Sequence, residues 1–372
     1  MTVLNLGDRR WPPPPDLEET RLVTQAAVSR SWTEGPWTAE VEHRMSALTG
    51  APYAIAFNSC TSAIHAAVQA MGCGPGMPLL VPSLTFAGTL TGARHIGVDV
   101  RWRDVDPDTL TVVLDPVEEA GSLLLAVDLH GAPHTVTPAA GPGGVRMLTD
   151  SCQALGTLSG GRHIGATGTH CWSFSAAKMV AAPDGGAVTT DDPDVARLLH
   201  QLRDYGIDDT SGGRANGAVS HPGGHNWRPS ELSMAMVAHR LTALPYWTDR
   251  ARHTAYRLHA GLDRLGLWRQ RAPEGTDPAW HKIRIGPAGQ DPAAAQRLAA
   301  GLTDAGVPTH AWGRHPLHRH PAFATALARR LPVTDRAAAG TFCLGTEACP
   351  PMTWTDDEID EVIDTLETLT EG

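Results

Sequence analysis

Only two lysines, Lys178 and Lys282, occur among the thirty basic residues of the chain, and all the others are arginine. A guanidinium cannot lose its proton to become a nucleophilic amine, whereas the ammonium group of a lysine can. A lysine retained in this background is therefore a candidate for covalent chemistry with an aldehyde or ketone. Compositional drift could produce the same low number of lysines. Whether either lysine is catalytic must therefore be judged from its neighbouring residues.

Lys178 ends the segment 172–178, which leads out of the apolar run 169–174. The motif Asp184-Gly185-Gly186 then precedes another apolar run. A lysine on a loop beside the end of a sheet can form a Schiff base. Pyridoxal phosphate supplies the aldehyde and stabilises the carbanion that forms next. A lysine taken at random is more often a solvated surface residue, so this interpretation depends on two further segments.

Asp150 ends the expected strand 147–150, and Gln153 follows three residues later. A carboxylate buried at a strand end is costly unless it meets a cation, and the protonated pyridine nitrogen of pyridoxal phosphate is such a cation. The alternative is that Asp150 caps the following turn or helix.

The turn Asn58-Ser59-Cys60-Thr61-Ser62 closes the first expected strand and opens a helix. Free backbone amides at a helix N-terminus favour a phosphate group, although serine and threonine there are also ordinary caps. Phe86 ends the next strand, where it could stack on a pyridine ring or pack in the core.

The elements that must position these residues alternate between short apolar runs and helical stretches, a pattern typical of a mostly parallel sheet with crossover helices. Apolar residues at helical spacing predict a helix over 61–71. Open sheets of this class place their sites at the carboxyl ends of strands. The expected strands are 54–59, 78–82, 99–105, 123–129, 147–150, 169–174 and 186–190.

After Glu231 the pattern becomes helical, over 232–244 and 247–265, with Pro245 between the two stretches. We interpret this as a linker helix between domains. A strand at 280–285, a helix at 292–305 and an acidic helix at 356–369 follow. The chain is therefore predicted to have a large α/β domain with an N-terminal segment, 1–244, and a linker helix with a small α+β domain, 245–372.

The chain has 372 residues, of which 42% are hydrophobic and 19% charged, so it can bury a large core and is not disordered. Its formal net charge is −10 and it has no basic block, which disfavours a nucleic-acid or acidic-membrane partner.

Six cysteines without a CxxC pair suggest neither a disulfide framework nor a thiolate zinc site. We expect them to be reduced. Met1–Arg10 lacks the apolar run of a signal peptide, and no apolar stretch is long enough to span a bilayer. These features predict a soluble, cytoplasmic protein.

Taken in order, the motifs resemble those of the DegT/StrS-type sugar aminotransferases, which depend on pyridoxal phosphate and have fold type I, an α/β fold with a mostly parallel central sheet. The resemblance covers nearly the whole chain. It rests on the motifs at 31–36, 59–61, 82–86, 104–107, 150–154, 173–178 and 225–228.

The resemblance implies a role for each matching residue. Lys178 resembles the lysine that forms the internal aldimine, and Asp150 resembles the partner of the pyridine nitrogen. Further implied cofactor-binding residues are Gln153 near the ring hydroxyl, Phe86 stacking on the ring, and Cys60, Thr61 and Ser173 at the phosphate. Asn226 looks like the asparagine that reaches the phosphate of the neighbouring subunit, which implies a homodimer with composite active sites.

The resemblance also implies a reaction, in which glutamate or glutamine donates an amino group to a keto sugar, a cyclitol ketone or a related ketone. The arginine-rich composition suggests a high-GC organism and hints at antibiotic or other secondary-metabolite biosynthesis. Two alternatives stay open: another pyridoxal-phosphate reaction, such as elimination or carbon–carbon bond chemistry at an amino-acid α-carbon, and a non-catalytic regulator on the same scaffold.

Departures from the family pattern bear on the substrate. Met179 stands where asparagine is common, Asp184 where glutamate is usual, and Tyr205 where histidine is frequent. Tyr205, Arg228 and His318 are candidate substrate contacts. His315, His318 and His320 lie close together, but two prolines interrupt the segment and no carboxylate joins them, so we expect no metal site.

Overall fold

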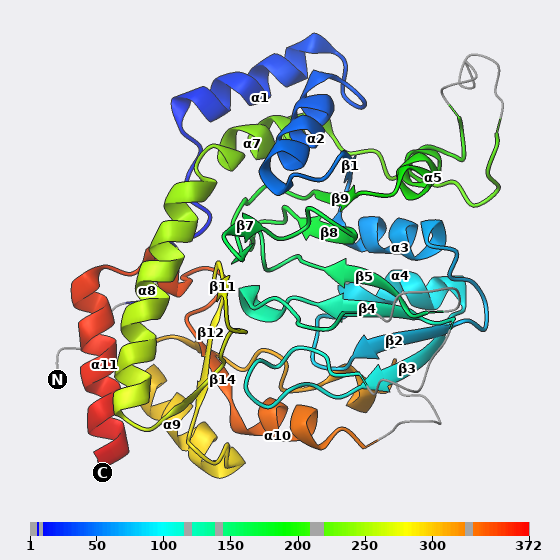
Figure 1. Cartoon of the computed structure of the whole chain (residues 1–372). Helices are drawn as coiled ribbons and strands as arrows, with labels where there is room; N and C mark the ends of the chain where they lie inside the picture. Colours follow the sequence, from blue (N-terminus) through cyan, green and yellow to red (C-terminus); the bar gives the residue numbers. More distant parts are fainter. Residues whose placement is uncertain are drawn as a thin grey trace.

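The computed structural model describes residues 6, 10–114, 121–137, 144–208, 219–323 and 330–371. Most of the N-terminal stretch expected to lack a targeting segment lies outside these residues. A seven-stranded sheet with the order β1-β9-β8-β5-β4-β2-β3 forms the centre of the large α/β part (Figure 1). Its strands are β1 Tyr53–Phe57, β2 Pro78–Pro82, β3 Asp99–Arg103, β4 Leu123–Val127, β5 Arg146–Asp150, β8 Thr169–Ser173 and β9 Gly186–Thr190.

Each expected strand of this sheet is present, with ends that differ from the expected ones by at most two residues. The pairs β2–β3, β2–β4, β4–β5 and β5–β8 are parallel, as the alternation predicts. Strand β9 runs antiparallel between β1 and β8. Because β9 alone is reversed, β1, β2, β4, β5 and β8 all point toward the same edge of the sheet.

Helix α3, Cys60–Ala70, confirms the expected helix and begins immediately beyond β1. The Ser59 side chain caps it by accepting a hydrogen bond from the Ser62 amide. Its apolar face packs on β8 and β9. At Gly186 a Cβ atom would lie 2.5 Å from the Cys60 nitrogen, so glycine there lets β9 approach the start of α3.

Two N-terminal helices that the sequence patterns did not reveal, α1 Leu17–Ser29 and α2 Pro36–Thr49, pack against α7, Glu231–Leu241. The fully buried Glu231 carboxylate accepts hydrogen bonds from the Trp37 and Thr38 amides at the first turn of α2. A Cβ atom at Gly35 would lie 2.5 Å from Glu231 Oε2. The motif at 31–36 is therefore built around a carboxylate nearly two hundred residues later in the chain.

Helix α8, Leu244–Arg264, begins with Pro245 in its first turn and leads into the C-terminal part. A four-stranded antiparallel sheet there has the order β10-β12-β14-β13. Its core includes residues from α8, this sheet and the two helices α9 and α11. The division into 1–244 and 245–372 places its boundary at the start of α8, and we retain it as a proposal. The bounds are β10 Trp268–Arg269, β12 Ile283–Gly286, β13 Thr309–His310, β14 Phe342–Leu344, α9 Pro292–Asp304 and α11 Asp356–Glu371.

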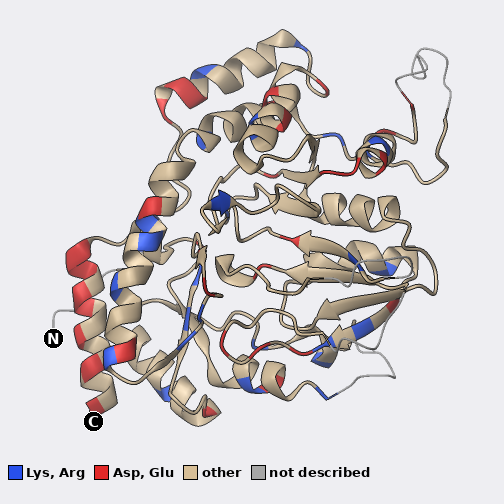
Figure 2. Ribbon diagram, viewed as in Figure 1, with Lys and Arg blue, Asp and Glu red and all other residues tan. Residues whose placement is uncertain are grey.

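Figure 2 shows acidic residues along α11, where the sequence predicts an acidic helix, and basic residues on the adjacent α8. Arg257 pairs with Asp356 and Asp360, and Arg264 pairs with Glu367 at 2.7 Å. Because these pairs are largely exposed, each contributes little to stability, and packing of the apolar faces holds the two helices together.

The remaining elements connect these two parts. Strands β6, β7 and β11 form a small three-stranded sheet that joins the large part to the segment after α8. No helix among the described residues is both long enough and apolar enough to cross a bilayer. The bounds are β6 Leu158–Ser159, β7 Arg162–His163, β11 Thr276–Asp277, α4 Gly88–Ile96, α5 Pro193–Arg203, α10 Pro332–Gly340, η1 Leu129–Gly131, η3 Leu317–Arg319 and η4 Pro351–Thr353.

Candidate active site

A cavity of about 330 Å³ lies at the edge toward which β1, β2, β4, β5 and β8 point. Residues that end or follow these strands line one side, which we call the sheet wall. Its members are Ser59, Cys60, Thr61, Thr85, Phe86, Asp128, Asp150, Cys152, Gln153, Ser173, Ser175 and Lys178. Four residues of the C-terminal part, His281, Lys282, Trp312 and Glu347, line the opposite side, which we call the C-terminal wall.

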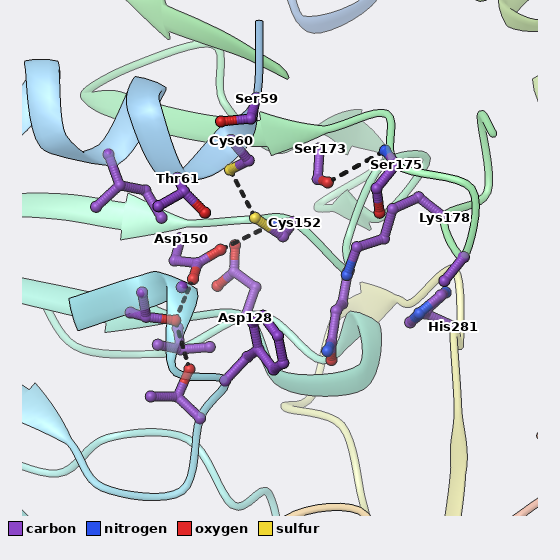
Figure 3. Close-up of a pocket in the computed structure, with 18 of the residues that line it drawn as sticks. Ser59, Cys60, Thr61, Asp128, Asp150, Cys152, Ser173, Ser175, Lys178 and His281 are labelled. Carbon is purple, nitrogen blue, oxygen red and sulfur yellow. Dashed lines mark hydrogen bonds between the residues drawn. The ribbon is translucent and has the colours of Figure 1, made fainter. Parts of the chain in front are cut away.

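Lys178 reaches into this cavity from the loop after β8 (Figure 3). Its backbone amide donates to the Ser175 carbonyl at 2.9 Å, which closes the turn that presents the side chain. The side chain is half-buried and makes no hydrogen bond or ion pair with the other described residues. Its amine is therefore accessible to a carbonyl compound in the cavity.

Asp150 lies at the end of β5 and is 5% exposed. Thr89 donates its hydroxyl hydrogen to Asp150 Oδ2 at 2.6 Å, and the Cys152 amide donates to Oδ1 at 3.1 Å. These neutral donors orient the carboxylate without neutralising it. A buried carboxylate held in this way is suited to a positively charged partner within the cavity.

Gln153 is oriented by the backbone that follows β4. The His130 amide donates to Gln153 Oε1 at 2.7 Å, which directs that oxygen away from the cavity. His130 is in turn fixed by its Nδ1 contact with Gln270 Oε1, also 2.7 Å. The amide nitrogen of Gln153 is therefore the group available to donate a hydrogen bond to a ligand.

The start of α3, the hydroxyls of Ser59 and Thr61, and Ser173 and Ser175 form a polar end of the cavity. The Ser175 amide donates to Ser173 Oγ at 3.4 Å. The first amides of a helix have no acceptor within the helix, and they favour an anionic group. This geometry fits the expected phosphate site at Cys60, Thr61 and Ser173.

Cys60 and Cys152 bring their sulfur atoms to 2.7 Å from each other beside Asp150. With Asp150 the two cysteines form a cluster whose possible metal-ligand atoms all lie within 4.8 Å of one another. The spacing of these residues in the sequence gave no sign of this cluster. Burial raises the pKa of the Cys60 thiol to about 11, and the contact with Cys60 together with burial raises that of Cys152. Both thiols are therefore protonated at neutral pH, and a metal ion would have to displace these protons to bind there.

Phe86 remains 66% exposed although it is a large aromatic residue that lines the cavity. A Cβ atom at Gly88 would lie 3.1 Å from both Phe86 Cδ1 and Thr61 Oγ1, so this glycine allows the aromatic ring and the polar end to come together. An exposed ring at this position offers a stacking surface to a planar ligand.

Tyr205, Asn226 and Arg228 lie together but do not line the cavity of their own chain. The Arg228 Nε donates to Asn226 Oδ1 at 3.0 Å, and its guanidinium lies 5.1 Å from the centre of the Tyr205 ring. Arg228 also pairs with Asp204 at 3.2 Å.

The structure places His318 outside the cavity lining, where it is 5% exposed. Its Nδ1 lies 2.6 Å from Ser83 Oγ, and its Nε2 lies 3.1 Å from Asp335 Oδ1. These contacts attach the segment containing η3 to the end of β2. His315 and His320 are exposed and do not join it in any metal-binding group of the described residues.

The sequence analysis singled out Lys282 without placing it in this site, and it missed Asp128, His281, Trp312 and Glu347. Asp128 directly follows β4, next to the end of β5 at Asp150, so its position at a strand end was a usable signal. Burial raises its pKa, but hydrogen bonds from His134 and Ser151 outweigh burial and keep the pKa below its ordinary value. The C-terminal wall gave no such signal, because its residues come from separate loops.

The cavity fits pyridoxal phosphate on three independent observations. The buried Asp150 carboxylate suits the protonated pyridine nitrogen, the start of α3 suits the phosphate, and exposed Phe86 suits the ring. Lys178 lies in the same cavity and suits the aldehyde.

Comparisons with known proteins agree with this fit. The family model of the DegT/DnrJ/EryC1/StrS aminotransferase family matches residues 15–367. DesV of S. venezuelae, solved in complex with a ketimine intermediate, has 25% sequence identity and a TM-score of 0.83, with 95% of each chain covered.

Two further solved structures share the fold. TlmJ, an aminotransferase from Streptoalloteichus hindustanus, has 23% identity and a TM-score of 0.81, with coverage of 97% of this chain and 98% of that one. The E. coli GDP-4-keto-6-deoxy-D-mannose-3-dehydratase with bound hydrated PLP has 18% identity and a TM-score of 0.83, with coverage of 96% and 100%. The chain therefore belongs to the DegT/DnrJ/EryC1/StrS family and is a pyridoxal-phosphate-dependent aminotransferase of fold type I.

Proposed function

We propose that this protein transfers an amino group from glutamate or glutamine to a keto sugar, a cyclitol ketone or a related ketone. The observation that supports this most is the presence of Lys178 and the buried Asp150 in one cavity. When bound, pyridoxal phosphate supplies a carbonyl for the donor amine and a ring that withdraws electrons from the reacting carbon.

Lys178 has two tasks in this proposal. Its amine holds the cofactor between turnovers, and once displaced by the donor it moves a proton to and from the reacting carbon. The cavity admits this because the side chain lies free of any described hydrogen bond. Asp150, fixed by Thr89 and the Cys152 amide, keeps the pyridine nitrogen protonated.

The other residues of the sheet wall position the cofactor. The start of α3 with Ser173 would bind the phosphate, the Gln153 amide would donate to the ring hydroxyl, and the Phe86 ring would cover one face. His281 lies on the opposite wall, and burial holds its pKa well below its ordinary range, so it is a weak base there. Each of these groups is a donor, acceptor or apolar surface where the cofactor requires one.

We further propose a homodimer in which Asn226 and its neighbours Tyr205 and Arg228 complete the cavity of the partner. Asn226 is exposed and outside its own cavity, and the pairing of Arg228 with Asp204 and Asn226 holds its loop in shape. Mixing inactive Lys178→Ala and Asn226→Ala chains then restores activity, because one of the two sites in each mixed dimer has both residues intact. Two inactive variants that stay inactive together would contradict composite sites.

We place this activity in the cytoplasm and in secondary-metabolite biosynthesis, such as that of antibiotics. All six cysteines are free, as expected in a reducing compartment. The arginine-rich composition supports a high-GC organism.

The experiment that tests the amino transfer is an absorption spectrum of the purified holoenzyme before and after addition of glutamate, then of glutamine. We expect the visible band to be replaced by a shorter-wavelength band while the corresponding keto acid is released. A bound cofactor that neither donor changes would contradict the proposal and favour another reaction at an amino-acid α-carbon. A protein that binds no cofactor after reconstitution would favour a regulatory scaffold.

A further inference from the structure

The second lysine of the chain lines the same cavity as the first. Lys282 comes directly before β12 and belongs to the C-terminal wall, whereas Lys178 belongs to the sheet wall. Thirty basic residues are present, so it is informative that both lysines meet at one cavity. The role of Lys178 follows from covalent chemistry, but nothing in that chemistry explains Lys282.

Lys282 is buried in an unfavourable setting. It is 7% exposed, and its ammonium makes no hydrogen bond or ion pair with the described residues. Burial lowers its pKa, the charges of Cys343 and Glu347 partly offset this, and the charge of Lys178 lowers the pKa further. The nearest acidic group on this wall, Glu347, is exposed and forms no ion pair with it. Because Lys282 lines the cavity, its unpaired ammonium is suited to an anionic partner that enters from solution.

The neighbouring groups cannot serve that partner. Burial and the charges of both lysines keep His281 neutral, because they lower its pKa well below the ordinary value. Arg284 lies close by on β12, but its three nitrogens donate to Thr341 Oγ1, the Trp312 carbonyl and the Ala337 carbonyl. Among the described residues that line the cavity, the cations are Lys178 and Lys282, and the first is committed to the cofactor.

The opposite wall supplies a second part of the argument. The phosphate of the cofactor is expected at the start of α3, on the sheet wall, whereas Lys282 lies on the C-terminal wall. Any amino donor of the α-amino-acid class has a carboxylate next to the amine that must reach Lys178. A nucleotide-linked ketone has phosphate oxygens instead. Both carry negatively charged oxygen atoms, which can accept the hydrogen bonds that the Lys282 ammonium does not make within the described chain.

We propose that Lys282 binds an anionic oxygen group of a substrate, the carboxylate of the amino donor or the phosphate of the ketone acceptor. It is a specificity-determining residue that holds the substrate's charged end against the C-terminal wall while the reacting carbon lies near Lys178. This inference rests on the proposed amino transfer for the identity of the two substrates.

The test uses two unreactive anions, glutarate for the donor and pyrophosphate for the acceptor, titrated calorimetrically into the holoenzyme. Lys282→Met keeps the length and apolar surface of the side chain but removes its charge. We expect it to weaken binding of one of the two anions by about 10- to 100-fold, the typical loss for a hydrogen bond to a charged group. Loss of glutarate binding assigns the donor carboxylate, and loss of pyrophosphate binding assigns the acceptor phosphate.

Arg314→Met is the matched control. Arg314 is exposed, lies two residues from Trp312 and is not part of the cavity lining, so this variant removes a nearby charge without changing the site. We expect it to leave both affinities within about twofold of wild type.

Thermal denaturation separates binding from structure. Because the uncompensated ammonium is destabilising, Lys282→Met should melt at the same temperature as wild type or higher, even though it binds the anion less well. The proposal is overturned if the folded Lys282→Met variant binds both anions as wild type does, or if wild type binds neither. Anion binding does not require turnover, so a failure of amino transfer in the spectra leaves this test intact.

Discussion

The two walls of the cavity are built differently. On the sheet wall, the polar side chain of Asp150 is already oriented by Thr89 and a backbone amide. On the C-terminal wall, Lys282 is buried without a partner and Glu347 is exposed. The Asp150 carboxylate on the sheet wall is therefore oriented before any ligand binds, whereas the Lys282 ammonium on the C-terminal wall has no hydrogen-bond or ion-pair partner among the described residues.

This difference indicates a division of tasks between a cofactor that stays and substrates that come and go. A resident group benefits from fixed donors and acceptors, because no reorganisation is needed at each turnover. A substrate must also leave, so an interaction that forms only in its presence is sufficient. The substitutions below should therefore affect cofactor retention on one wall and substrate selection on the other.

The largest effect is expected for Lys178→Ala, which removes both the covalent attachment and the proton-transfer group. Turnover should fall by about 10³-fold or more, since general acid–base catalysis alone contributes 10²- to 10⁴-fold. Lys178→Arg keeps the charge and should be equally inactive. The measurement is the rate of amino transfer from glutamate or glutamine to a ketone acceptor, monitored as keto acid formed from the donor. Full turnover by Lys178→Ala would refute the site.

The next largest effect is expected for the rate at which iodoacetamide alkylates Cys60 in the cofactor-free protein. Its thiol has a pKa of about 11, so at pH 8 it should react at least about 100-fold more slowly than a free thiol. The rate should rise roughly tenfold per pH unit up to that pKa, since only the thiolate reacts. Mass spectrometry of the alkylated peptide gives the rate, and fast labelling at pH 7 would show that the sheet wall is not closed around this thiol.

Asp150→Asn tests the charge of the sheet wall. The amide keeps the shape of the side chain but cannot hold the pyridine nitrogen protonated, so cofactor affinity should fall about 10- to 100-fold. Dialysis followed by absorbance of the retained cofactor measures this loss. The exposed Asp191→Asn serves as control and should retain the cofactor as wild type does.

Phe86→Ala should weaken cofactor binding by only about 2- to 10-fold, the range expected for one aromatic stacking contact. The melting temperature of the cofactor-free protein should stay unchanged, because this ring is 66% exposed and contributes little to the core. A large drop in that melting temperature would mean that Phe86 is a core residue instead.

The smallest effect is expected for Glu347→Gln on the C-terminal wall. Its carboxylate is exposed and unpaired in the described part of the chain, so cofactor affinity should not change. Anion binding near Lys282 should become tighter by less than about threefold, since exposed charges interact weakly. Loss of the cofactor in this variant would contradict the proposal that the C-terminal wall binds substrates and does not hold the cofactor.

The sequence predicted several residues of the sheet wall because each of those follows a recognisable local pattern, whereas Asp128 and the contact of Cys152 with Cys60 were missed. Asp150 ends an apolar run, Cys60 and Thr61 open an amphipathic helix, and Lys178 lies on the loop after another apolar run. These are properties of short segments, and the family resemblance assigned a role to each one. The positions of these residues in one cavity agree with the prediction, while their roles await the experiments above.

The C-terminal wall could not be predicted because it depends on distant contacts. Residues 281 and 282 join Glu347 only because Ile283 pairs with Leu344 across the small sheet. The reversed direction of β9 likewise has no signature in an alternating apolar pattern. His318 was expected near the substrate, but its contacts with Ser83 and Asp335 depend on how two remote segments pack.

The capping of α2 by Glu231 has a consequence for the order in which the chain matures. The Trp37 and Thr38 amides that begin α2 find their acceptor 193 or more residues later. While the protein emerges from the ribosome, the first turn of α2 therefore lacks this acceptor until the chain has been synthesised as far as Glu231. Over that interval the surfaces of α1 and α2 that later pack on α7 are uncovered, and this is the period in which a nascent chain of this kind benefits most from a chaperone.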